Sequence, residues 1–185
     1  MEYMIRKYEP RDAQQVTDLY KVCLATAYKH KGQHVANLQN WFATTKLSEG
    51  GDMHDVWEFY MTGKHKARCF WVAECDGAVV GCVGSMESTK YDDSYIELVR
   101  LAVSDSMRGR GVGSALTKAF EEYGISLGYA NANLSTLKLM DMAVSLYNKH
   151  GYSIVEHVQV PVPEGVEGWG DIPIIVVHLT KVLRQ

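Results

Sequence analysis

The sequence predicts a mixed α/β fold in which helices pack on a central sheet of about seven strands. Three observations lead to this prediction. Short runs rich in β-branched and aromatic residues recur along the chain, segments with apolar residues at helical spacing separate them, and glycine, proline or aspartate marks most boundaries. A chain of 185 residues, 46% hydrophobic and 22% charged, can bury a sizeable core. We therefore expect one globular domain spanning residues 1–185.

The first third of the chain predicts an edge strand followed by helices. The weak alternation in YMIRKYE, residues 3–9, indicates the strand, and Pro10 stands where a helix can begin. Apolar residues then repeat at helical spacing from Val16 to Ala27. Similar spacing within residues 35–42 predicts a second helix, and within residues 56–60 a short third one.

The segment CFWVAECDGAVVGCVGSM, residues 69–86, predicts a β-hairpin. Two β-rich runs flank Asp76-Gly77, a dipeptide typical of a tight hairpin turn. The buried strand YIELVRLAV follows at 95–103, and a helix runs from Val112 to a stop at Gly128. The remaining elements are a strand at 132–137, a helix that ends at Gly151, and two strands within 152–160 and 172–182.

Composition and charge exclude several classes of protein. The formal net charge of -3 differs from that of a general nucleic-acid-binding domain, which is clearly basic. No apolar run approaches the ~18 residues of a membrane-spanning helix, and the first residues lack the apolar core of a signal peptide. The four cysteines form no C-x-x-C pair, so we interpret them as reduced thiols and expect no metal site. We expect a cytoplasmic protein that binds neither nucleic acid nor membrane.

The segment VSDSMRGRGVGSALTKAF, residues 103–120, places three glycines and two arginines directly before a helix. Backbone N–H groups at a helix start have no partners within the helix, and the helix dipole adds partial positive charge there. Glycines let a phosphate approach these N–H groups, and Arg108 and Arg110 add formal charge. The segment therefore predicts a phosphate-binding loop, with a plain surface turn as the alternative interpretation.

Two other types of phosphate-binding loop do not fit this segment. A P-loop requires a lysine after its last glycine, and none follows Gly113. A dinucleotide-binding fingerprint requires a third glycine where this chain has Ser114 or Leu116. It also requires an acidic residue about twenty positions further on, whereas residues 129–131 are Tyr, Ala and Asn.

Two motifs instead resemble the GNAT superfamily of acetyl-CoA-dependent N-acetyltransferases. ELVRLAVSDSMRGRGVGSAL, residues 97–116, is similar to motif A of the family and contains its R-x-x-G-x-G/A loop. AVSLYNKHGY, residues 143–152, resembles motif B. The hairpin at 69–86 is similar to that of the camello-like branch, without the membrane segment usual in that branch. The resemblance implies the GNAT fold, a mixed, mostly antiparallel sheet of about seven strands flanked by helices.

The resemblance also implies that acetyl-CoA is the co-substrate, and it assigns roles by position. The glycine loop would hold the pyrophosphate, and the strand before it would pair with the pantetheine arm. The Leu101 N–H would polarise the thioester carbonyl, an interaction that often dominates acyl transfer. Tyr147 occupies the position of the acid that protonates the CoA thiolate. The implied cofactor-binding residues are Leu101, Ala102, Val103, Arg108, Gly109, Arg110, Gly111, Val112, Gly113 and Ser114.

Acetyl transfer to an amine also needs a proton acceptor, because an amine with a pKa of about 10 arrives protonated near neutral pH. Regular strand alternation would place Glu97, Val99, Leu101 and Val103 on one face, close to the thioester. A glutamate at this position is the base in the histone-acetylating branch of the family, so Glu97 is our candidate general base.

The two catalytic candidates have structural alternatives. Tyr147 would otherwise be a packing residue on a half-buried helix. Glu97 would otherwise lie in solvent or pair with Arg100, and the proton would then pass to water or to Glu87 or Glu74.

We expect an acyltransferase that moves the acetyl group directly to a primary amine in a ternary complex, because no cysteine lies in a motif suited to an acyl-enzyme. The expected acceptor is a small molecule or an amino-acid derivative. Protein lysine or N-terminal amines, or a CoA-binding module without turnover, are the alternatives. His157 and His178 either line the acceptor site or are structural histidines. Trp169 either forms a lid over the acceptor or lies at an exposed loop tip. A homodimer is compatible with the family resemblance.

Overall fold

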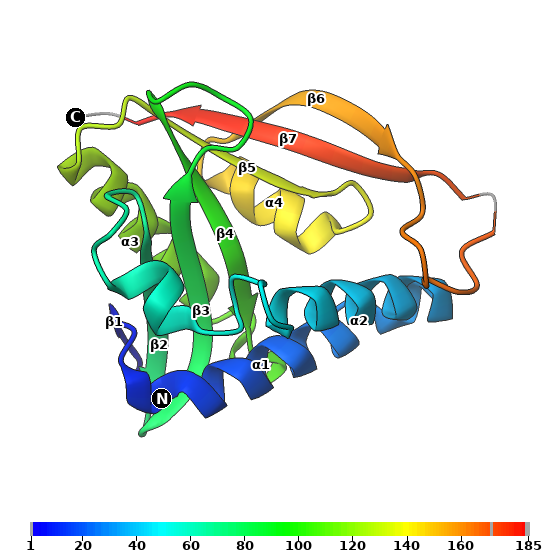
Figure 1. The fold of residues 1–185 in the computed structure, drawn as a ribbon, viewed down its shortest axis with the longest axis horizontal. Coiled ribbons are helices and arrows are strands. Elements are labelled where there is room, and N and C mark those ends of the chain that lie inside the picture. Colours follow the sequence, from blue (N-terminus) through cyan, green and yellow to red (C-terminus); the bar gives the residue numbers. More distant parts are fainter. Residues whose placement is uncertain (1, 171, 184–185) are drawn as a thin grey trace.

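The computed structural model describes residues 2–170 and 172–183, and its centre is a seven-stranded sheet (Figure 1). The strand order is β1-β2-β3-β4-β5-β7-β6. β4 and β5 pair in parallel, whereas the other five neighbouring pairs are antiparallel. This confirms the predicted mixed, mostly antiparallel sheet with the first strand at its edge. The strands are β1 (Met4–Lys7), β2 (Cys69–Cys75), β3 (Ala78–Glu87), β4 (Tyr95–Val103), β5 (Asn131–Leu137), β6 (Ser153–Val160) and β7 (Ile174–Val182).

Helices cover both faces of the sheet. Consecutive strand residues point to opposite sides, so apolar strand residues on each side need a helix to bury them. α1 packs through Val16 and Leu19 against the side that carries Phe70, which we call the α1 face. α3 packs through Phe120 against the side that carries Trp71, the α3 face. α2 lies beside α1, as Figure 1 shows. The helices are α1 (Ala13–Thr26), α2 (Gln33–Leu47), the π-helical turn η3 (Trp57–Met61), α3 (Val112–Ser126) and α4 (Asp141–Lys149).

The hairpin between β2 and β3 has the turn that its sequence predicts. Asp76 has φ 50° and Gly77 has φ 79°, so both central residues of the turn are left-handed. This matches the type I′ geometry that suits the twist of the two strands. The hairpin places β3 beside β4, the strand that carries the motif A residues.

A bulge interrupts β4 in its middle. Cys82 pairs with Ala102 and Gly84 pairs with Val99, so Arg100 and Leu101 together oppose a single β3 residue. Arg100 has φ 58°, which is left-handed and unusual for a residue other than glycine inside a strand. The extra residue reverses the alternation of side chains in the second half of β4.

The prediction that Glu97, Val99, Leu101 and Val103 share one face is therefore wrong. Val99 packs in the cluster on the α1 face, whereas Leu101 and Val103 pack against the cluster on the α3 face. Regular alternation holds only up to the bulge, and nothing in the local sequence marks where it stops.

β4 and β5 also diverge, and this divergence positions the candidate site. Their parallel pairing ends at Glu97 and Asn133, although β4 continues to Val103 and β5 to Leu137 (Figure 1). We call the opening between these two continuations the β4–β5 gap. Beyond Glu97, the edge of β4 that faces the gap has no strand partner.

Candidate functional site

The glycine loop lies at the end of β4 and leads directly into α3. Gly109 has φ 73° and Gly111 has φ 84°, and both conformations favour glycine. Gly111 is the N-cap of α3 and no side chain caps the helix. The first N–H groups of α3, beginning at Val112, are therefore free to bind an anion, and the helix dipole favours this.

The two arginines of the loop differ in their partners. Nη2 of Arg108 lies 2.6 Å from Oδ1 of Asp105, so part of its charge is already balanced. Arg110 is exposed and forms no ion pair with any residue that the structure describes. Of the two side chains, Arg110 is the one whose charge is free for an incoming anion.

α4 packs directly against the start of α3. A Cβ atom on Gly113 would lie 3.2 Å from the Leu146 side chain, so glycine lets the two helices approach closely. The next residue, Tyr147, is only 6% exposed, and its ring lies edge-on to that of Tyr152 at 5.9 Å. Burial raises the pKa of Tyr147 far above its ordinary value, which keeps the phenol protonated. Its hydroxyl has no hydrogen-bond partner among the described residues.

Glu97 lies at the vertex of the β4–β5 gap and is buried, with 9% exposure. Its Oε2 accepts hydrogen bonds from the backbone N–H and the hydroxyl of Thr89, both at 3.0 Å. Arg100 instead pairs with Asp52. Glu97 is thus neither exposed nor paired with Arg100, and both structural alternatives predicted for it are wrong.

The other two carboxylates considered as a base are in ion pairs. Oε2 of Glu87 lies 3.0 Å from Nε of Arg68, and Oε2 of Glu74 lies 2.6 Å from Nη2 of Arg6. Glu74 lies on β2 and is separated from β4 by β3. Glu97 is the member of this set that borders the gap.

A row of polar side chains continues from Glu97 across the α1 face. The register pairs Glu97 with Asn133, and pairs Ser135 of β5 with His178 of β7, which places all four side chains on one side of the sheet. We call these four residues the polar row. Ser135 Oγ lies 2.7 Å from Nδ1 of His178. Asn133 is 1% exposed, and its Oδ1 has no hydrogen-bond partner among the described residues.

Sequence reasoning missed Asn133 and Ser135. They alternate within NANLSTL, and that alternation already marks one polar face of β5. Sequence alone does not show that this face meets Glu97 and His178, because strand register is not visible in it. Burial lowers the pKa of His178, so its imidazole is neutral at physiological pH.

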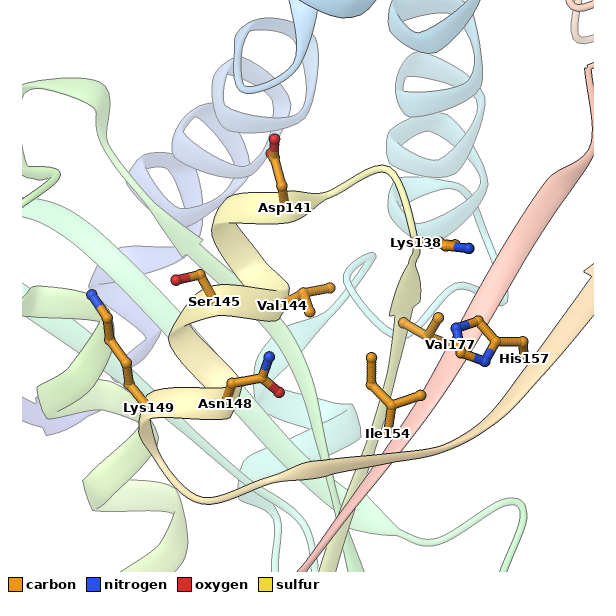
Figure 2. Close-up of a pocket in the computed structure, with 9 residues that line it drawn as sticks. All are labelled: Lys138, Asp141, Val144, Ser145, Asn148, Lys149, Ile154, His157 and Val177. Carbon is orange, nitrogen blue, oxygen red and sulfur yellow. The ribbon is translucent and has the colours of Figure 1, made fainter.

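His157 does not join His178. It lies on β6 opposite Val177, and it lines an open groove between α4 and strands β6 and β7 (Figure 2). The α4 residues in this groove include Val144 and Asn148, one turn apart, whereas Tyr147 is not among them. The groove is thus separate from the polar row and lies on another side of α4 from Tyr147.

Trp169 is a core residue, so the predicted exposed loop tip is wrong. It is 2% exposed, and its ring lies 5.0 Å from the ring of His34, edge to face. The neighbouring backbone is tied to α2 as well, because Nδ2 of Asn37 donates to the carbonyl of Glu167 at 2.9 Å. Trp169 therefore anchors the loop between β6 and β7 on α2, a contact that local sequence does not indicate.

Two general features accompany the site. No helix in the described part of the chain combines the length and apolar character needed to cross a membrane. Across residues 2–170 and 172–183, His, Cys, Asp and Glu form no group of three or more that could hold a metal ion. All four cysteines are buried and unpaired.

The chain matches the model of the Acetyltransferase (GNAT) family over residues 35–152. It is 34% identical over 113 residues to an N-acetylaspartate synthetase from Xenopus tropicalis, covering 60% of this chain and 40% of that protein. It is 35% identical over 101 residues to the Xenopus tropicalis protein named "Probable N-acetyltransferase camello", covering 55% and 45%. The chain thus spans less than half the length of these relatives.

A solved structure shares the fold at low sequence identity. The protein yncA from Salmonella typhimurium, solved with its cofactor acetyl-CoA, superimposes with a TM-score of 0.66. It is 15% identical, and the match covers 100% of this chain and 96% of that one. The family match extends over most of the chain and includes β4, the glycine loop and α4, so the chain belongs to the GNAT family of acetyltransferases.

Proposed function

We propose that this protein transfers the acetyl group of acetyl-CoA to the primary amine of a small molecule. One observation carries the proposal: the β4–β5 gap opens beside an uncapped helix start whose glycine loop carries a free arginine, Arg110. Acetyl-CoA is the acetyl donor used by the GNAT family, and its diphosphate and extended arm match these two features.

The glycine loop is suited to the pyrophosphate of acetyl-CoA. The N–H groups of Gly109 and of residues 111–114, together with the charge of Arg110, would hold the phosphates, with Arg108 shared with Asp105. The unpaired edge of β4 from Leu101 to Val103 would then pair with the amide groups of the pantetheine arm, as an added strand does. This places the thioester near the Leu101 N–H, which would stabilise the developing oxyanion.

Tyr147 is suited to protonate the departing thiolate. Its phenol is held neutral by burial, its hydroxyl has no competing partner, and its helix packs on the glycine loop through Leu146. A neutral phenol can donate to the CoA sulfur and recover its proton from water.

Glu97 is suited to accept the amine proton through water. Leu101 lies four positions after Glu97, which would be about 13 Å along a regular strand and somewhat less across the bulge, too far for direct contact with an amine at the thioester. Thr89 holds Oε2 of Glu97, while Oε1 accepts no hydrogen bond from a described residue. The buried Oδ1 of Asn133 offers a second acceptor on the same face, where it could hold the amine or a relay water.

The proposed acceptor is a small amino-acid-like amine. The similar proteins include one named for N-acetylaspartate synthesis, which supports a small acceptor. The loop between β6 and β7 is fastened to the start of α2 through Trp169 and Asn37. The acceptor would lie over the polar row, with its amine toward Glu97 and Asn133.

An acceptor screen tests the proposed function. Purified protein with acetyl-CoA is given free amino acids, diamines or short peptides, and thiol release is measured. We expect release with one class of small amine. Release only with peptides would favour a protein acetyltransferase. Acetyl-CoA that raises the melting temperature without release for any amine would indicate a CoA-binding module.

A further inference from the structure

We propose that the buried ion pair between Arg100 and Asp52 holds the bulge of β4, and so positions the acetyl-binding backbone that follows it. The proposal rests on the proposed function, since it assigns the pair to that reaction. Arg100 and Asp52 would be positioning residues, because neither belongs to residues 101–103, the part of β4 proposed to meet the thioester and the pantetheine arm.

The left-handed backbone conformation of Arg100 must be stabilised by other parts of the molecule. Residues other than glycine rarely adopt a left-handed φ, and a strand interior is an unusual place for it. The other such residue in the described chain, Asp76, lies in a tight turn that requires it. The tertiary structure must therefore supply what stabilises φ 58° at Arg100.

The side chain of Arg100 supplies that interaction. Its Nε lies 2.7 Å from Oδ2 of Asp52, and its Nη2 lies 2.8 Å from Oδ1. The hydroxyl of Tyr60 donates to Oδ2 of the same carboxylate. Two parallel hydrogen bonds fix the plane of the guanidinium, which constrains the backbone from which the side chain extends.

The partner carboxylate is itself held firmly. Asp52 is 7% exposed, and its neighbour Met53 is 2% exposed and donates its N–H to the carbonyl of Lys46 at 3.0 Å. At Gly51, any Cβ would lie 2.3 Å from that same carbonyl oxygen, so the chain turns there against the end of α2. The carboxylate therefore links β4 to α2 and, through Tyr60, to η3.

The pair remains charged in the folded protein. Burial raises the pKa of Asp52, but the hydrogen bonds and the charge of Arg100 outweigh burial and hold that pKa below its ordinary value. A buried arginine without this carboxylate would be strongly destabilising, so the two residues act as one unit.

The bulge matters because it sets the relation between the two halves of β4. Before it, Glu97 points to the α1 face, and after it, Leu101 and Val103 pack on the α3 face. Without the extra residue, one half of the strand would turn over and the backbone at Leu101 would shift relative to Glu97. A displaced oxyanion donor at Leu101 would reduce the rate of acetyl transfer, whereas the glycine loop would still hold the pyrophosphate.

Two double variants test this proposal by separating the ion pair from the backbone conformation. Arg100→Gly with Asp52→Asn removes the pair but leaves a residue that tolerates the left-handed φ. Arg100→Val with Asp52→Asn removes the same pair and favours a regular strand. Neither leaves a buried charge unpaired, so both are expected to fold. Circular dichroism and thermal melting verify this.

We expect the valine variant to lose about 10²–10³ in kcat, as for a lost oxyanion donor, while its acetyl-CoA affinity changes little. The glycine variant should keep most of its kcat. Equal kcat in both folded variants, whether high or low, would overturn the proposal. A control, Arg6→Met with Asp12→Asn and Glu74→Gln, removes another bidentate pair, with distances of 2.7 and 2.8 Å, together with the second carboxylate that Arg6 binds, and should leave kcat unchanged.

Amide hydrogen exchange along residues 97–103 gives a readout independent of turnover. In the wild type, the alternation of slow and fast amides should break at Arg100, and in the valine variant it should become regular. Unchanged exchange in the valine variant would also overturn the proposal. If the wild type releases no thiol from acetyl-CoA with any amine, the proposed function fails, while the exchange pattern still tests whether the pair holds the bulge.

Discussion

The glycine loop and the polar row lie at the same gap between β4 and β5, yet they are built in different ways. The loop and the strand before it are one contiguous segment, and the chemistry expected of them uses backbone N–H groups. The polar row uses side chains from β4, β5 and β7, which are far apart in sequence. A site made of backbone leaves a motif in the sequence, whereas a site made of side chains from several strands does not.

The two regions also differ in charge. The helix start and the exposed Arg110 make the loop positive. The polar row contains the carboxylate of Glu97 and a His178 that burial keeps neutral. A positive end and a negative end match an anionic co-substrate and a cationic amine, which supports the proposed order of binding groups along the gap.

Gly111→Asp should have the largest effect on acetyl-CoA binding and turnover, because it changes the phosphate-binding loop directly. It introduces negative charge at the helix N-cap and a side chain at φ 84°. For the wild type, acetyl-CoA at 100 times its Kd should stabilise the fold by about 2.7 kcal/mol, and NAD or ATP by much less. We expect the variant to lose the acetyl-CoA stabilisation and all turnover, measured by thermal shift and thiol release.

Gly111→Asn is the matched control. Asparagine tolerates the left-handed region and carries no charge, so this variant isolates the electrostatic part of the effect. It should retain part of the thermal shift. Stabilisation of the wild type by NAD to the same extent as by acetyl-CoA would contradict the assignment of the loop.

Tyr147→Phe should have the next largest effect, and it tests the side chain nearest the loop. The substitution keeps the buried ring and removes a hydroxyl that has no hydrogen-bond partner among the described residues, so stability should change little. If the phenol protonates the thiolate, kcat should fall about 10²–10⁴-fold with little change in acetyl-CoA affinity. Steady-state kinetics with a fixed amine measures this, and near-native turnover would make Tyr147 a packing residue.

The difference between the two regions explains which parts of the molecule could be predicted. Local chemistry predicted the hairpin at Asp76-Gly77, since that dipeptide requires little beyond its own conformation. The glycine loop and the start of α3 also follow from contiguous residues, and the structure has both where they were predicted. The roles of the loop residues remain predictions.

Long-range contacts determine what could not be predicted. The bulge at Arg100 depends on Asp52, which is 48 residues away, so no local pattern indicates it. Trp169 is buried because α2 supplies His34 and Asn37, more than a hundred residues earlier in the chain. The polar row depends on strand register, which alternation along one strand does not define.

Glu97→Gln should have a smaller effect on turnover, because water can carry the amine proton to other acceptors. We expect kcat/KM to fall about 10²-fold, the lower end of the range for a positioned base. The loss should shrink for amines of low pKa, which arrive partly deprotonated. Kinetics with a series of amines gives the slope of log(kcat/KM) against amine pKa in wild type and variant. Glu87→Gln is the matched control, since Glu87 pairs with Arg68 and should leave this slope unchanged.

Parallel slopes with a constant offset would show that Glu97 does not take the proton. In that case the Thr89 contacts would make Glu97 a residue that holds the segment between β3 and β4 in place. A residue that only attracts a cationic acceptor would instead raise KM and leave kcat unchanged.

The smallest predicted effect is a pH dependence of stability that belongs to the polar row and not to the loop. Burial and the charge of Lys90 lower the pKa of His178, and Glu156 and Glu97 oppose this without reversing it. The unfolded chain therefore binds this proton more readily than the folded protein. Stability is complete above the ordinary histidine pKa of about 6.5 and falls as the pH drops below it. Urea unfolding at pH values between about 7.5 and 5.5, in steps of ~0.5, would measure the slope of the unfolding free energy against pH.

His178→Gln should make this slope shallower, because the glutamine does not titrate. His150, whose pKa burial also lowers, lies near Glu121 and away from the polar row, so His150→Gln serves as the matched comparison for stability. Both substitutions should reduce the acid sensitivity of unfolding, but only His178→Gln should also change the KM for the amine, since His178 borders the proposed acceptor position. An unchanged KM in His178→Gln, together with a shallower pH slope, would restrict His178 to the sheet and leave Glu97 and Asn133 as the polar-row residues that contact the amine.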